Sequence, residues 1–188
     1  MKKSMFLFIV LLPILSIAQF HLPVSNSVSN AIAQVIEDFP NHFNKIRGEI
    51  ISKDVQAVNY ASTINISGAD SSIIIQNGND SDNIYSWTET VFVTDEFDKA
   101  KEKFHEYFTK IKATAATIDN KKISFHAEYI APDDTKHFTT ILFTANNETP
   151  QLKNVVIDLS MQYVLSGWQI IVSVYEHTDY GVDDKQEN

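Results

Sequence analysis

Three residues of this chain could together form a site that binds a metal ion or transfers a proton. His126 and Glu128 stand two positions apart in a stretch with the period of a β-strand, so they would share one face of it. His137 opens the next expected strand and would lie opposite them. Two imidazoles and a carboxylate suit zinc, and the same groups suit a hydrolase with a His/Asp/Glu site. The alternative is an ordinary solvated strand face, on which His and Glu need no special role.

The motifs of the most easily recognised enzyme classes are missing from the sequence. It contains no Cys, no glycine-rich phosphate loop, no His-Glu-x-x-His and no Ser in a Gly-x-Ser-x-Gly elbow. His42 and His105 are expected on the solvent side of helices. We therefore predict no catalytic residue and no cofactor, and we leave metal binding open. A hydrolase that uses His126, Glu128 and His137 is the alternative to a non-enzymatic protein.

Five large aromatic residues could stack on a sugar or a peptide if they were exposed: Trp87, Trp168, Tyr85, Tyr163 and Tyr175. Large aromatic side chains more often belong to a hydrophobic core, and that is our expectation for these residues.

The first of two predicted helices begins at Ser27 or Ser29, either of which could cap it. Pro40 should kink or restart this helix, with Asp38 as a new cap, and Gly48 should end it. Its apolar residues recur at steps of three and four and form one stripe toward a core. These residues are Ile32, Val35, Ile36, Phe39, Phe43 and Ile46.

The second predicted helix begins at Thr94 or Asp95. It should be straighter than the first, because His105 stands where the first helix has proline. Its inner face should carry Phe97, Ala100, Phe104, Phe108 and Ile111.

The two helical stretches, residues 35–49 and 100–114, align without a gap. Further on, the pattern Trp-x-x-x-Val-x-Val occurs twice, opened by Trp87 and by Trp168. This agreement indicates an internal duplication, in which each copy begins with a helix and closes with a Trp-led strand. The copies would span about residues 27–93 and 94–176.

Between and after the helices, apolar and polar residues alternate, which predicts strands. Turn residues separate these strands at short intervals, so we expect hairpins and an antiparallel sheet. The predicted fold class is α+β, built as αβββ followed by αββββ, with both helices on one face of the sheet. The expected strands are residues 55–66, 72–76, 84–93, 122–130, 137–145, 152–159 and 167–175.

The N-terminus has the pattern of a secretory signal peptide. Lys2 and Lys3 precede an apolar run, residues 5–15, and small residues follow it up to Ala18. The run is shorter than the roughly 20 residues of a membrane span, so we predict cleavage after Ala18 and no membrane span in the mature chain. The protein is then exported, to the periplasm or to the extracellular space.

The mature chain is expected to form a single domain, residues 19–178, followed by an acidic and mobile tail, residues 179–188. Without Cys it has neither disulfides nor a lipid anchor on cysteine, so the hydrophobic core alone must hold it together. Without Lys2 and Lys3, 13 basic residues remain against 24 acidic ones. This balance excludes a nucleic-acid binder, because contacts with phosphate need Lys and Arg.

Three segments of the chain carry a resemblance to a known group of proteins: the Lys-led signal that ends in Ile-Ala-Gln, the stretch of residues 39–49, and the closing strand of residues 167–175. In these segments the chain resembles small secreted proteins of Bacteroidota without an assigned function. The resemblance implies export and supplies no active-site residue. The duplicated plan also resembles β-lactamase-inhibitor-like and TATA-binding-protein-like folds, a likeness at the level of fold that does not fix function.

The function predicted from these observations is a non-enzymatic binding or interaction module. The sheet face that the helices leave open, or a cleft between the two copies, would receive a protein, a peptide or a small apolar ligand.

Overall fold

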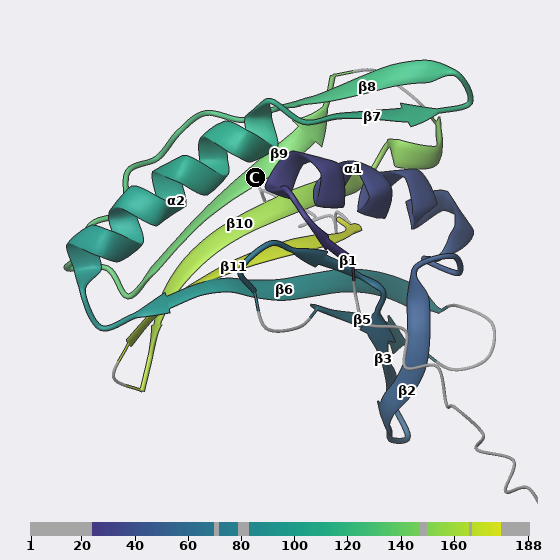
Figure 1. Cartoon of the computed structure of the whole chain (residues 1–188), viewed down its shortest axis with the longest axis horizontal. Helices are drawn as coiled ribbons and strands as arrows, with labels where there is room; N and C mark the ends of the chain where they lie inside the picture. The colour runs from purple at the N-terminus through teal and green to yellow at the C-terminus, as the bar shows by residue number, and fades with distance from the viewer. Residues whose placement is uncertain (1–23, 70–71, 79–82, 147–149, 166, 178–188) are drawn as a thin grey trace, which may run out of the picture.

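The structure is a computed structural model that describes residues 24–69, 72–78, 83–146, 150–165 and 167–177 (Figure 1). The predicted signal peptide and the predicted acidic tail lie outside these residues. Two helices, α1 (Val28–Asp38) and α2 (Phe97–Lys112), pack against a large antiparallel sheet. The predicted α+β class is therefore confirmed.

Nine strands form the main sheet: β2 (Arg47–Lys53), β3 (Ala57–Ser62), β5 (Ser72–Asn77), β6 (Ile84–Thr94), β7 (Ala115–Ile118), β8 (Lys121–His126), β9 (Phe138–Ala145), β10 (Val155–Val164) and β11 (Gly167–Glu176). Their order across the sheet is β2-β3-β5-β6-β11-β10-β9-β8-β7. Two short parallel strands, β1 (Val24–Asn26) and β4 (Ile64–Ile66), form a second, small sheet. Two 3₁₀ turns, η1 (Phe39–Asn41) and η2 (Pro150–Leu152), complete the described elements.

The centre of the main sheet is the pair of β6 and β11, which are the two Trp-led strands. They run antiparallel, and Trp87 lies opposite Val174. The strands that follow α1 fill the sheet on one side of this pair, and the strands that follow α2 fill the other side. Figure 1 shows β6, β11 and β10 running beneath α2. We call the junction of β6 and β11 the central seam.

The hydrophobic core lies between the helices and the inward face of the sheet. Trp87 is fully buried in it, and its Nε1 donates a hydrogen bond to Ser62 Oγ at 3.2 Å. Each large apolar side chain that is removed from water stabilises the fold by about 1.5–3 kcal/mol. Both helices and both halves of the sheet supply fully buried residues, among them Ile32, Ile36, Phe43, Ile74, Phe104, Ile111, Phe143 and Ile157.

A bulge interrupts the central seam at Val91. Thr90 pairs with Ile171 and Phe92 pairs with Ile170, so Val91 is the extra residue on β6. Its carbonyl oxygen accepts a hydrogen bond from the Oη of Tyr107 on α2, at 3.1 Å. The bulge therefore provides the point at which α2 is hydrogen-bonded to the middle of the sheet.

The prediction that the first helix continues to Gly48 is wrong. α1 ends at Asp38, and the chain turns sharply at His42 and Phe43, which both adopt the left-handed conformation. Asp38 stands at the N-cap position of η1, as predicted, but its side chain makes no capping hydrogen bond to that turn. Its Oδ2 instead accepts the backbone N–H groups of Lys45, at 2.7 Å, and of Ile46, at 3.2 Å.

Gly48 belongs to a strand rather than to a helix end. It lies in β2, where a Cβ atom would stand only 3.0 Å from the carbonyl oxygen of Ala61. The residue is glycine because the neighbouring strand passes so close.

The predicted number of strands is too low in both halves. Five described strands follow each helix, against the three and four predicted. Neither β2 nor β7 was predicted, because the predicted helix reached only the first two residues of β2 and β7 has only four residues. The predicted strand of residues 55–66 is divided into β3 and β4, and the predicted strand of residues 122–130 ends at His126.

Candidate functional site

The structure does not bring the three residues of the predicted metal or hydrolase site together. His126 is the last residue of β8, and Glu128 follows in a segment without regular structure, so they do not share a strand face. His126 lies opposite Thr144 on β9, whereas His137 precedes the other end of that strand. At about 3.4 Å per residue, this places the two histidines roughly 24 Å apart along the strand. The predicted arrangement is wrong.

The histidines have other surroundings. The His137 ring lies 5.5 Å from the ring of Tyr163 and 6.5 Å from that of Trp168, measured between centroids. His105 is exposed on α2, as predicted, whereas His42 is exposed in the turn after η1 and stacks on Tyr85 at 4.9 Å. Within the described part of the chain, no group of three or more His, Asp or Glu residues is placed to hold a metal ion.

The aromatic residues mostly belong to the core. Trp87 and Trp168 are buried, and Tyr85 and Tyr175 are half-buried. Tyr163 departs from the prediction, because 39% of its surface is exposed at the end of β10.

A groove of about 820 Å³ follows the second half of β6. It arises because β5 and β6 differ in length: the last pair between them is Ser72 with Glu89, and β6 continues to Thr94. Beyond Glu89, the side of β6 that faces away from β11 has no strand partner among the described residues. The groove is lined by Ile51, Gly68, Ala69, Ile73, six successive residues of β6 from Thr88 to Val93, and Ile171.

The lining of this groove, which we call the β6 groove, is mainly apolar. Ile73 and Ile171 come from the strands on either side of β6, and Ile51 comes from β2. Thr88 and Thr90 add hydroxyl groups, and the Thr88 hydroxyl is hydrogen-bonded to that of Ser173 at 2.7 Å. Such a surface can bind an apolar group and orient it with a few hydrogen bonds.

Glu89 is the one ionisable residue among the described residues that line the β6 groove. Only 1% of it is exposed, and its Oε2 accepts the backbone N–H of Ile66, from β4, at 2.9 Å. Its Oε1 has no hydrogen-bond partner in the described part of the chain. Burial raises the pKa of the Glu89 carboxyl from 4.5 to about 7, because the charged form loses its hydration. The hydrogen bond from Ile66 acts in the opposite direction.

A second polar cluster lies on the face of the sheet that points away from the core. Asp158 accepts hydrogen bonds from Thr140 at 2.7 Å and from the Oη of Tyr175 at 3.1 Å. Burial, with the nearby Asp158 carboxylate, raises the pKa of Tyr175 to about 12. Both carboxylate oxygens of Asp158 are thus engaged, and no nucleophile lies beside an available base in this cluster.

Sequence reasoning missed both Glu89 and the β6 groove. A signal for Glu89 was present, because an acidic residue stands between Trp87 and Val91 on the inward face of an otherwise apolar alternation. No such signal exists for the groove, which depends on where β5 stops pairing with β6.

Comparison with protein-family models, with curated proteins and with solved structures gave no match. The described helices include none that is long and apolar enough to span a membrane. The interpretation of the site therefore depends on its geometry alone.

Proposed function

We propose that this protein is an exported, non-enzymatic binding module and that the β6 groove receives its partner. The observation that carries the proposal is the groove itself, an apolar hollow of about 820 Å³ at the central seam, with hydroxyl groups at Thr88 and Thr90. Binding sites for small molecules and peptides are typically concave and apolar with a few polar groups. The candidate catalytic residue His137, in contrast, lies at the other end of β9 from His126.

The proposal includes the internal duplication and the export of the protein. The topology supports a duplication, since each helix is followed by five strands and the two Trp-led strands meet at the central seam. The N-terminal sequence and its resemblance to secreted Bacteroidota proteins support export. The β6 groove then lies where the two copies join.

Binding of Nile red, an apolar fluorescent dye, tests the proposal. Thr90→Trp should fill the β6 groove at little cost to folding, because Thr90 is exposed. Leu142→Trp is the matched control, on the outward face of β9 and three strands away from β6. We expect the wild type and the control to enhance dye fluorescence equally, and Thr90→Trp to lose at least about tenfold in affinity, a difference of about 1.4 kcal/mol.

Two results would contradict this proposal. One is the absence of dye binding to the wild type, and the other is equal binding to Thr90→Trp. Thermal unfolding followed by circular dichroism shows that each variant is folded, so that a lost signal reports on the β6 groove.

A further inference from the structure

We infer that the partner in the β6 groove is an extended polypeptide segment, which adds as a strand to the free edge of β6 over residues 90–94. The inference rests on the proposed function and specifies the class of ligand. A strand edge offers backbone N–H and C=O groups at a regular spacing, and another extended backbone satisfies them best.

The edge is available over a defined length. β6 is an 11-residue strand whose pairing with β5 stops at Glu89, so within the described part of the chain residues 90–94 are paired with β11 alone. The six successive β6 residues that line the groove come from both faces of the sheet, because Glu89 and Val91 are buried and Thr90 is exposed. The lining of the β6 groove therefore includes the edge of the strand as well as its outward face.

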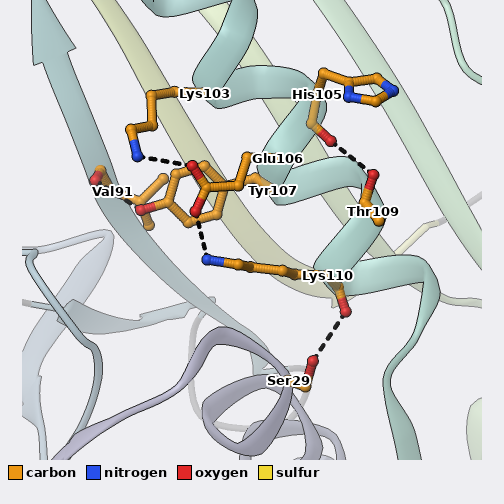
Figure 2. A network of polar contacts seen from close by, with 8 residues as sticks. All are labelled: Ser29, Val91, Lys103, His105, Glu106, Tyr107, Thr109 and Lys110. Atoms are coloured by element: carbon orange, nitrogen blue, oxygen red, sulfur yellow. Dashed lines mark hydrogen bonds and ion pairs between the residues drawn. The ribbon is translucent and has the colours of Figure 1, made fainter.

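One acceptor on this part of β6 is already used. The Val91 carbonyl at the bulge accepts the hydroxyl of Tyr107, as Figure 2 shows. An incoming strand must pair with the other backbone groups of residues 90–94, and the bulge sets its register.

The two outer edges of the sheet are obstructed, in contrast to the free part of β6. On β7, the Thr117 N–H donates to Glu37 Oε1 of α1 at 2.8 Å. On β2, two irregularities interrupt the pairing with β3, and Arg47 and Lys53 stand at its ends. The contact of β7 with α1, and the irregular pairing and charged ends of β2, discourage strand addition. Within the described main sheet, a second copy of this chain offers no unobstructed outer edge, so we assign the free edge of β6 to another polypeptide.

Charge restricts the sequence of the partner. Among the described residues that line the β6 groove, one is acidic, Glu89, and none is basic, and the whole chain carries a formal charge of −9. An acidic strand would be repelled. This argues against the chain's own end, residues 178–188, which has four acidic residues and one lysine. The partner is neutral or basic and has apolar residues at alternate positions, where they meet Ile73 and Ile171 on the outward face of the sheet.

The test uses a synthetic peptide of alternating threonine and valine with a lysine at each end, added to the purified full chain. Hydrogen exchange of individual amides, followed by NMR, reports on the edge of β6. We expect the rapidly exchanging amides among residues 90–94 to slow by about tenfold or more, because strand pairing removes them from water. The peptide with glutamate in place of threonine should give a smaller effect.

The decisive controls are two versions of the peptide, N-methylated at the valine or at the threonine positions. Each keeps every side chain, and one of them removes the donors that face β6. Equal protection by the parent and by both N-methylated peptides, or no slowing at millimolar parent peptide, would overturn strand addition. If Nile red still binds in either case, the proposed function stands and only the peptide inference fails. If the dye does not bind either, both fail.

Discussion

The end of α1 and the middle of α2 have aligned sequences but different backbone conformations. In the first region, Asp38, Asn41 and Lys45 form a turn that leads out of the helix. Asp38 Oδ1 accepts a hydrogen bond from Asn41 Nδ2 at 3.1 Å, and Oδ2 accepts the Lys45 N–H. Pro40 cannot donate a helical hydrogen bond, and its ring disfavours further helix. The chain therefore leaves α1 and enters β2.

In the second region, the residues aligned with that turn are Lys103, Glu106 and Lys110. Glu106 lies between the two lysines along α2 and forms an ion pair with each, as Figure 2 shows. His105 stands at the proline position, so every backbone donor in this stretch is retained. Pairs three and four residues apart support a helix.

The difference teaches that the identical residues of the two stretches do not decide the backbone. Phe43 and Phe108 are aligned and both are buried, although Phe43 is in a left-handed turn and Phe108 is in a helix. The apolar residues determine which side chains are buried in the core, and the polar residues between them determine whether the backbone turns or stays helical.

The largest expected effect comes from truncating these aligned phenylalanines. Phe43→Ala and Phe108→Ala should each lower the free energy of unfolding by about 3–5 kcal/mol, because each leaves a cavity in the core. Urea unfolding measures both values. A loss below about 1 kcal/mol for either variant, within the range of ordinary surface substitutions, would show that the aligned positions are not equivalent in the core.

The next largest effect should come from Asp38→Ala. The substitution leaves the N–H groups of Lys45 and Ile46 without their acceptor, and Asp38 is buried. We expect a loss of about 2–3 kcal/mol in unfolding free energy. Lys103→Ala is the aligned control, and its half-exposed ion pair should be worth less than about 1 kcal/mol. Equal losses of unfolding free energy for the two variants would show that the polar contacts of the turn contribute no more to stability than those of the helix.

The free energy of unfolding should depend on pH because of Glu89. Its pKa of about 7 in the fold exceeds the ordinary 4.5, so its contribution to stability is complete below about pH 4.5 and is lost as pH rises through 7. We expect the wild type to lose on the order of 2 kcal/mol between pH 5 and pH 8 relative to Glu89→Gln. Urea unfolding of both proteins at each pH measures this difference.

His42→Gln is the control for this pH dependence. His42 stacks on Tyr85, near the start of β6 and away from Glu89. A pH dependence that survives in Glu89→Gln but disappears in His42→Gln would contradict the assignment of this dependence to Glu89.

The smallest expected effect concerns the hydroxyl at the bulge. Tyr107 is aligned with His42, and both contact β6. Tyr107 contacts it at Val91, and His42 contacts it at Tyr85. Tyr107→Phe removes the hydrogen bond to the Val91 carbonyl and should lower the unfolding free energy by about 1 kcal/mol. It should also speed hydrogen exchange near the bulge. No change in either measurement would show that the contact does not hold α2 to the central seam.

The strands and the core were largely predictable from the sequence, and the turns between layers were not. Alternation identified β6 and β11, and it placed Trp87 and Trp168 in the core, because buried faces impose a period on the sequence. The end of α1 depends on Asp38 reaching backbone groups seven and eight positions away. Such a contact produces no periodic pattern in the sequence.

The candidate site could not be predicted for a related reason. His126, Glu128 and His137 formed a plausible set only while β8 was expected to extend past Glu128. The β6 groove depends on the relative lengths of β5 and β6 and on the register between them, and these are properties of several strands together. One sequence pattern does not contain them.

The central seam also has a consequence for the order of folding. Each half of the sheet can form from hairpins between neighbours in the chain, but β6 and β11 come from distant parts of it, so their pairing closes a long loop and should be slow. Both tryptophans of the chain lie in these two strands. Tryptophan fluorescence should therefore follow the joining of the halves, while far-ultraviolet circular dichroism follows the earlier hairpins. In a stopped-flow experiment the circular dichroism signal should change first.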